Sequence, residues 1–217
     1  MPDSLIPARA AFRFSVPCLE ATAGTLGKDL ELPERFQLPF LGELEGRKPV
    51  ADVRAGWNEE GLVFSVRVFG KRAAPWCRDS RIDDSDGLQI WIDTRDTHNI
   101  HRASRFCHRF VFLPAGAGRK LDDAVAEQML INRARENAKP AKSAALKAQA
   151  EKRVDGYVLR ALIAAGALTG FDPVDNPRLG FTYLLADREL GEQTFTVGGE
   201  FPYREDPSLW GTLELVK

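Results

Sequence analysis

Cysteine is scarce in this sequence, and what there is does not form a motif. The 217 residues contain Cys18, Cys77 and Cys107, an odd number at spacings too wide for a C-x-x-C pair. We expect free, mostly buried thiols. Histidine is equally rare: His98 and His101, followed by a cysteine, have metal-binding residue types but lack four ligands at a tetrahedral spacing. We expect these histidines to lie in surface loops.

Long apolar runs are absent as well. Nothing approaches the roughly 18 uninterrupted apolar residues of a membrane-spanning helix, so no membrane partner is expected. Residues 1–14 contain two arginines and no apolar segment of the kind found in a secretory signal. This pattern predicts a cytoplasmic protein, or an extracytoplasmic one if a signal has already been removed.

Neither charge sign dominates, and motifs of catalysis are missing. The net charge of −1 gives no reason to expect a nucleic-acid partner. The sequence has no G-x-S-x-G, P-loop, H-E-x-x-H or dinucleotide-binding motif. Acids near strand ends would suit a glycosidase only at the correct separation, which a sequence does not give. We therefore predict a protein that is not an enzyme and has no catalytic residues; its oligomeric state is left open.

Period-2 alternation of apolar and polar residues is the strongest pattern present. It predicts strands over residues 53–57, 62–69, 88–92, 106–113, 146–154, 157–163, 179–187 and 210–215. Short strands separated by turn residues predict an all-β fold, an antiparallel β-sandwich of jelly-roll or immunoglobulin-like type with little helix. Trp57, Trp91 and Trp210 lie within strand patterns and are expected in the core.

We expect one domain over residues 1–217, in which the proline-rich residues 1–49 wrap around the sandwich as strands and loops. Within that segment, residues 11–16 alternate as a strand that ends at Pro17, and residues 36–41 indicate an edge segment.

Residues 121–152 are ambiguous. Residues 125–131 have the composition of a helix, whereas residues 146–154 alternate as a strand before the turn signal Asp155-Gly156. The second pattern predicts a hairpin with residues 157–163. The rest of this segment stays open between hairpin, helix and disorder.

Five motifs occur in the order typical of a known family. The first is G-L-V-F-S-V at 61–66, which follows a tryptophan-containing strand and a turn. The next two are D-G-L-Q-I-W-I-D at 86–93 and G-Y-V-L-R-A-L-I at 156–163. The last two are the G-F pair at 180–181, followed by an aspartate at 187, and D-P-S-L-W-G-T-L-E-L at 206–215. From about residue 50 to the C-terminus, this series resembles the carbohydrate-binding modules of family 9, within the wider group of DOMON-like sandwiches. The resemblance implies a non-catalytic β-sandwich that holds the ends of mono- or oligosaccharides between two aromatic rings, often with structural calcium.

The resemblance also assigns site residues. Trp76, displaced by extra residues, and Tyr203, in place of the usual tryptophan, match the stacking positions. Gln89 stands where the family has a hydrogen-bonding carboxylate, and Arg109 matches an arginine on the next strand, with His108 as a register alternative one residue away. The alternative from burial habits is that the two aromatic rings pack under their own loops and the arginine pairs with a surface acid.

Two further positions depart from the family pattern. Leucine, either Leu184 or Leu185, replaces a polar residue on the strand that begins near Gly180, so one sugar contact is lost. Arg160 stands where the family has glutamate. The lost polar residue near Leu184 and the lack of a visible signal segment favour a second hypothesis, a protein-interaction or structural sandwich with a decayed sugar site.

No cofactor is required by these patterns, although they admit two candidates. Asp83, Asp84 and Asp86 supply the oxygen ligands that Ca²⁺ prefers, so a structural calcium ion is an alternative to solvated turn carboxylates. The EF-hand pattern fails, because its first position would be Ile82. Some DOMON-like sandwiches bind haem through methionine or histidine, and Met129 with His108 is the one plausible pair here.

Overall fold

The computed structural model describes residue 10, residues 13–22 and residues 32–217, apart from the side chain of Asp79. Within this part of the chain the strands are β1 (Ser15–Glu20), β2 (Ala51–Asn58), β3 (Gly61–Phe69), β4 (Gly87–Asp93), β5 (Cys107–Ala117), β6 (Asp123–Met129), β7 (Leu146–Arg153), β8 (Gly156–Ala164), β9 (Arg178–Asp187), β10 (Gly191–Thr194) and β11 (Gly211–Val216). The helical segments are short 3-10 turns: η3 (Glu34–Phe36), η4 (Leu41–Glu45), η5 (Asp79–Asp84), η6 (Ser143–Ala145), η7 (Ala165–Ala167) and η8 (Pro207–Leu209). No described helix is long and apolar enough to cross a membrane.

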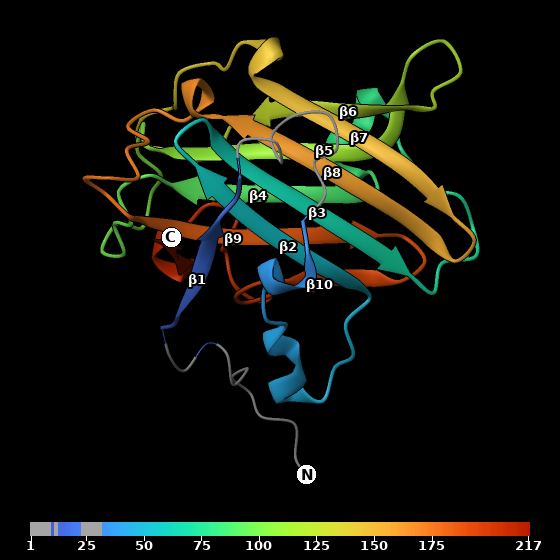
Figure 1. Cartoon of the computed structure of the whole chain (residues 1–217), viewed down its shortest axis with the longest axis horizontal. Helices are drawn as coiled ribbons and strands as arrows, with labels where there is room; N and C mark the ends of the chain where they lie inside the picture. Colours follow the sequence, from blue (N-terminus) through green and yellow to red (C-terminus); the bar gives the residue numbers. More distant parts are fainter. Residues whose placement is uncertain (1–9, 11–12, 23–31) are drawn as a thin grey trace.

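The strands form one continuous sheet that folds into two layers (Figure 1). Its order is β6-β5-β4-β9-β11-β1-β2-β3-β8-β7, with β10 attached to β9. The end strands β6 and β7 lie against each other, so the sheet almost closes on itself. The predicted all-β sandwich is therefore confirmed. Two pairings differ from a purely antiparallel sandwich, because β1 runs parallel to both β11 and β2.

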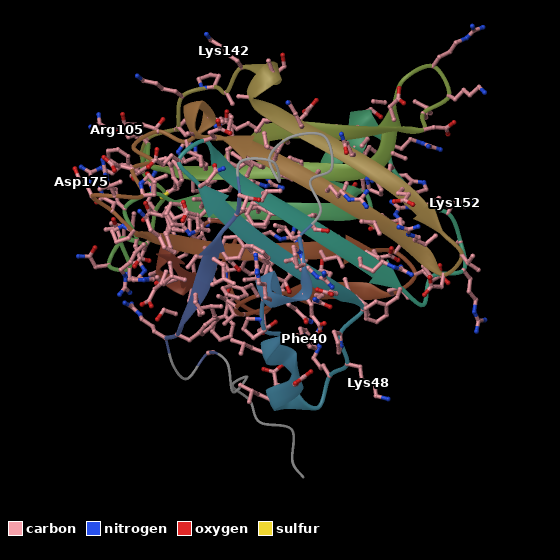
Figure 2. The ribbon with its side chains drawn as sticks, in the orientation of Figure 1. Phe40, Lys48, Arg105, Lys142, Lys152 and Asp175 are labelled. Carbon is pink, nitrogen blue, oxygen red and sulfur yellow. The ribbon has the colours of Figure 1, made fainter. Side chains whose placement is uncertain are left out.

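The main core fills the space between the layers. Leu88, Ile90 and Ile92 point into it from β4, as the alternation of that strand requires. Phe64 from one layer and Phe181 from the other stack face to face, with ring centroids 5.9 Å apart. Labelled lysines such as Lys142 and Lys152 point outward into solvent (Figure 2).

Three expectations from the sequence agree with the structure, two about buried residues and one about strand pairing. Trp57, Trp91 and Trp210 are all at most 3% exposed. The three cysteines are free and buried. The hairpins β2–β3 and β7–β8 form in the predicted order, the second around the Asp155-Gly156 turn.

Three local predictions need correction. The first strand runs through Pro17 rather than ending there; its ladder with β2 includes only Leu19 and Glu20, so the proline lies where just one side of the strand is paired. The start of the predicted strand, at residues 11 and 12, lies outside the described residues. Residues 36–41 form no edge strand, since a single bridge from Gln37 to Arg54 separates two 3-10 turns.

The third correction concerns residues 125–131, whose composition admitted a helix. Residues 125–129 belong to strand β6, because the adjacent β5 offers an antiparallel ladder from Arg109 to Leu113, and residues 130 and 131 follow the end of that strand. Tertiary pairing overrides local propensity here.

Candidate functional site

Gln89 and Arg109 lie on the outer face of the sheet, opposite the main core. The strand register places Gln89 beside Leu184 and Val111, and Trp91 between Arg109 and Thr182. Leu184 is thus the residue that stands where the family pattern has a polar side chain, while Leu185 packs in the main core. The face is covered by η5, by residues 71–78 and by the segment that contains Tyr203.

A buried arginine holds an exposed carboxylate on this face. Arg109 is 8% exposed, and its guanidinium donates to Gln89 Oε1 at 2.7 Å and to the carboxylate of Asp83. Gln89 donates in turn to the Asp83 carbonyl oxygen at 3.3 Å. Burial lowers the pKa of Arg109 and the Asp83 charge opposes that shift; the guanidinium stays charged. Asp83, whose side chain is half exposed, is therefore a fixed acceptor at the surface.

His108 points to the other side of the sheet. It stacks on Phe110 within the layers, with centroids 5.9 Å apart, and its Nε2 accepts from the backbone N–H of Thr169 at 3.1 Å. It is thus no register alternative to Arg109 and no loop histidine. Met129 is the ladder partner of Arg109, so it shares the outer face, and the haem pair proposed from sequence lies on opposite faces of the sheet.

The buried imidazole predicts a pH-dependent stability. Burial lowers the pKa of His108 from 6.5 to about 4, so below pH 6.5 the unfolded chain binds a proton that the folded chain refuses. Stability is full above pH 6.5 and falls as the pH drops toward 4, by about 2 kcal/mol at pH 5. Urea unfolding measures the free energy of unfolding at pH 7 and at pH 5. The difference between the two values should be smaller by this amount in His108→Gln than in the parent, because the glutamine keeps an acceptor for Thr169 but does not titrate. The exposed His101→Gln is the control; an unchanged pH difference in His108→Gln would contradict the assignment.

Trp76 lies half-buried beside the same face, among arginines. The guanidinium carbon of Arg188 is 3.3 Å from the centroid of its ring, and those of Arg78 and Arg81 are 5.6 Å and 5.9 Å away. One buried carboxylate fixes this arrangement: Asp86 accepts from the backbone N–H groups of Trp76 and Arg188, each at 2.9 Å.

Beneath the tryptophan is a buried ion cluster that the sequence did not reveal. Lys71 Nζ lies 3.1 Å from Asp86, 2.9 Å from Asp187 and 3.7 Å from Glu189. Burial alone would lower the pKa of Lys71, but its hydrogen bonds to Asp187 and Asp86 and their charges raise it, so the ammonium persists at neutral pH. The sequence shows Asp86 and Asp187 at strand ends, but no pattern in it identifies Lys71 as their partner.

These contacts leave the three aspartates unsuited to calcium. Asp86 is engaged by Lys71 and two backbone N–H groups, Asp83 by Arg109, and Asp84 by Arg81 at 2.6 Å. Among the described residues, no three histidine, cysteine or acidic side chains converge on a metal position. The residues do not fit the structural calcium ion that the sequence left open as an alternative to solvated carboxylates.

Tyr203 is fully buried and offers no ring face to solvent. It makes an edge contact with Trp91, with centroids 5.7 Å apart, and its carbonyl oxygen accepts from the Trp210 indole at 2.7 Å. Its hydroxyl accepts from Arg204 Nε at 3.4 Å. In this arrangement Tyr203 supports Arg204 rather than forming a stacking platform.

A cleft of about 460 Å³ opens over these groups. Its lining is polar and charged at the rim, with Leu184 and Ala186 beneath, and consists of Arg81, Asp83, Asp84, Ser85, Asp86, Leu184, Ala186, Asp187, Arg188, Gly191, Glu192 and Arg204. Sequence reasoning missed Arg188 and Arg204, because both are ordinary loop arginines until the fold brings them beside Asp83 and Trp76.

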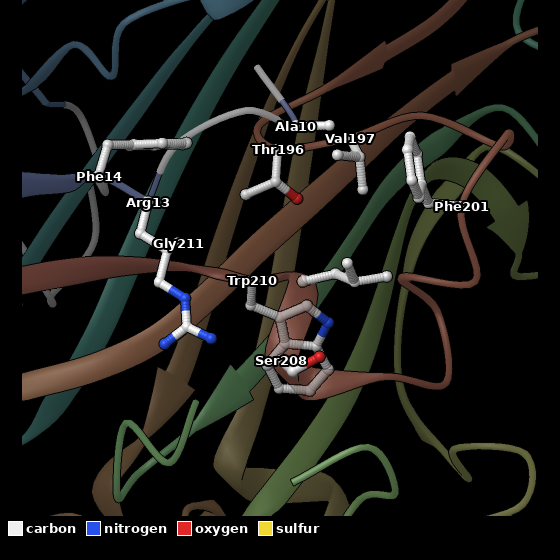
Figure 3. A pocket seen from close by; sticks show the side chains of 10 residues that line it. Ala10, Arg13, Phe14, Thr196, Val197, Phe201, Ser208, Trp210 and Gly211 are labelled. Atoms are coloured by element: carbon white, nitrogen blue, oxygen red, sulfur yellow. The ribbon is translucent and has the colours of Figure 1, made fainter. Parts of the chain in front are cut away.

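A second, smaller cavity of about 230 Å³ lies near the start of β11 (Figure 3). Phe14, Val197, Phe201 and Trp210 give it an aromatic and aliphatic lining, with Arg13 at one side. None of the residues assigned from the sequence lines it. The charged cleft is therefore the better candidate site.

Comparisons with known proteins support the fold. No protein-family model matches the sequence, and no curated protein matches it. A family 9 carbohydrate binding module from Caldicellulosiruptor kristjanssonii in complex with cellotriose aligns with a TM-score of 0.62 at 11% identity, over 94% of each chain. The same module with glucose aligns at 0.63 and 12% identity, over 93% of this chain and 95% of that one.

A third solved structure, described as a candidate carbohydrate-binding protein from Bacteroides uniformis, aligns with a TM-score of 0.56 at 13% identity, over 93% of this chain and 98% of that chain. The sandwich of family 9 modules is thus the fold of this chain along nearly its whole length. At such low identity the likeness establishes the fold, and the ligand must be argued from the chemistry of the cleft.

Proposed function

We propose that this protein is a non-catalytic carbohydrate-binding module whose sugar site is the cleft beside Trp76. The observation that carries the proposal is Asp83, an exposed carboxylate held by the buried pair Arg109 and Gln89 at the edge of a cleft. A carboxylate accepts hydrogen bonds from two neighbouring hydroxyl groups, and a neighbouring guanidinium donates to ring and hydroxyl oxygens. The complexes of similar structures with glucose and cellotriose support this assignment.

Each group has a defined part in this proposal. Asp83 and Glu192 accept from sugar hydroxyls, and Arg204 donates. Gln89 and Arg109 position Asp83 from below, and Trp76 bounds one end of the cleft through its contacts with Arg81 and Arg188.

Binding without catalysis fits the charges of the cleft. Its exposed carboxylates are each paired with arginine: Asp83 with Arg109, Asp84 with Arg81, and Glu192 with Arg204 at 3.3 Å. A glycosidase acid needs apolar surroundings that keep it protonated at neutral pH. Paired carboxylates of this kind suit recognition of hydroxyl groups.

A glycan array that includes oligosaccharides with free ends, run with Ca²⁺ and with EDTA, tests the proposal. We expect binding to a related group of sugars under both conditions. Asp83→Ala should weaken it at least about tenfold by titration calorimetry, because a hydrogen bond to a charged group contributes about 1.5–3 kcal/mol. Trp76→Ala should weaken it as well, because the ring holds Arg81 and Arg188 at one end of the cleft. Glu34→Ala, an exposed carboxylate outside the cleft, is the matched control. Full affinity in Asp83→Ala would remove this cleft from the proposal.

Leu184 favours the second candidate function, a protein-interaction sandwich. It places an apolar side chain next to Gln89 on the outer face, where a sugar would be expected to meet a polar group. This alternative predicts that no sugar on the array binds. It also predicts that the parent captures a specific protein that Asp83→Ala no longer retains.

A further inference from the structure

We infer that the cleft prefers sugars that carry an anionic group, a carboxylate or a sulfate, and that Arg188 is the residue that determines this preference. The inference rests on the proposed function, since it specifies the ligand of the same cleft. It follows from how Arg188 is held and from the charges around it.

A ligand beside Trp76 would contact the guanidinium of Arg188 and not the indole ring beneath it. Its guanidinium lies directly over the Trp76 ring, 3.3 Å from the centroid, and the side chain is exposed. A neutral pyranose stacks its C–H face on an uncovered aromatic ring, and here a cation covers that ring. The stack is preorganised, because the backbone N–H groups of both residues bind the buried Asp86 carboxylate.

The charges around the stack leave cations without partners. Every described carboxylate lining the cleft contacts a cation: Asp83, Asp84 and Glu192 each pair with one arginine, and the single ammonium of Lys71 serves both Asp86 and Asp187. Glu189 accepts from the backbone N–H groups of Arg72 and Ala73. By contrast, Arg72, Arg78 and Arg188 form no ion pair with any described side chain. Among the described side chains, the charged groups at the Trp76 ring that lack an ion-pair partner are therefore two arginines, Arg78 and Arg188.

The geometry of the stacked guanidinium suits an anion. Stacking uses the face of the group and leaves its N–H donors free around the edge, where they match the two oxygens of a carboxylate or sulfate. Arg81 and Arg204 line the same cleft, and their ion pairs are exposed, with side chains about half accessible. Such exposed pairs are weak, so both arginines can turn to an incoming anion.

Titration calorimetry with three trisaccharides at low salt tests the inference: cellotriose as the neutral probe, trigalacturonate for a carboxylate, and a sulfated galactan trisaccharide for a sulfate. We expect at least one anionic probe to bind about tenfold more tightly than cellotriose, with the difference shrinking at 0.5 M salt. Arg188→Ala should abolish this preference and Arg188→Lys should keep part of it. The two anionic probes distinguish carboxylate from sulfate recognition.

Arg105→Ala is the matched control, because Arg105 is an exposed arginine that also lies over an aromatic ring, Phe106, away from the cleft. Equal affinity for neutral and anionic probes would overturn the inference and leave the proposed function standing. If neither the probes nor the array sugars bind, both the inference and the proposed function are wrong. A preference that survives in a folded Arg188→Ala variant would overturn the assignment to Arg188.

Discussion

Replacing Lys71 with methionine is expected to lower the free energy of unfolding by about 3–5 kcal/mol, the usual effect of leaving a buried charge without its partner. Asp86 and Asp187 are each at most 5% exposed, and Lys71 is the cation that both contact. Methionine matches the length of the lysine side chain, so the variant removes the charge while largely conserving the packing. Urea unfolding at pH 7 measures the difference.

Two further variants make this result specific. Lys152→Met removes an exposed lysine and should change stability by less than about 0.5 kcal/mol. Adding Asp187→Asn to Lys71→Met should recover part of the loss, because it removes one of the two stranded negative charges. If the single Lys71→Met variant were as stable as the parent, the cluster would not hold the cleft together in the way its burial indicates.

Much of the fold is predictable because alternation is local. The strand predicted over residues 106–113 forms as β5, where period-2 geometry places His108, Phe110 and Phe112 opposite Arg109. The failures lie where pairing partners are remote. Strand β6 forms because β5 lies beside it, and β1 passes Pro17 because β11 pairs it in parallel. No window of neighbouring residues contains that information.

The site was harder to predict for the same reason. Lys71 and Asp187 are 116 residues apart, so nothing in the sequence joined the acidic strand ends to a buried cation, and the carboxylates suggested calcium instead. Tyr203 matched an aromatic position in the family pattern, but its ring turns inward against Trp91. Gln89 and Arg109 share one face of the sheet because strand register fixes both, and they lie beneath Asp83 instead of lining the cleft.

Replacing Trp91 with alanine is the second large effect that we expect, a loss of about 3–5 kcal/mol in the free energy of unfolding. Trp91 is fully buried on the outer face, where it packs against Tyr203, Leu184 and Trp210. Its indole N–H makes no hydrogen bond within the described part of the chain. Trp91→Phe should therefore lose roughly half as much, since only ring volume is removed.

The same pair of variants separates support of the cleft from contact with the sugar. Trp91 does not line the cleft, but the Arg109 guanidinium lies 5.3 Å from its ring, and Tyr203, which packs on it, supports Arg204. At a temperature where Trp91→Ala is still folded, its sugar affinity should fall, whereas Trp91→Phe should bind as the parent does. Parental affinity in a folded Trp91→Ala variant would mean that Arg109 and Arg204 are positioned without this ring. The buried residues packed around Trp91 would then stabilise the fold alone, and the cleft would depend on Asp86 and Lys71 for its shape.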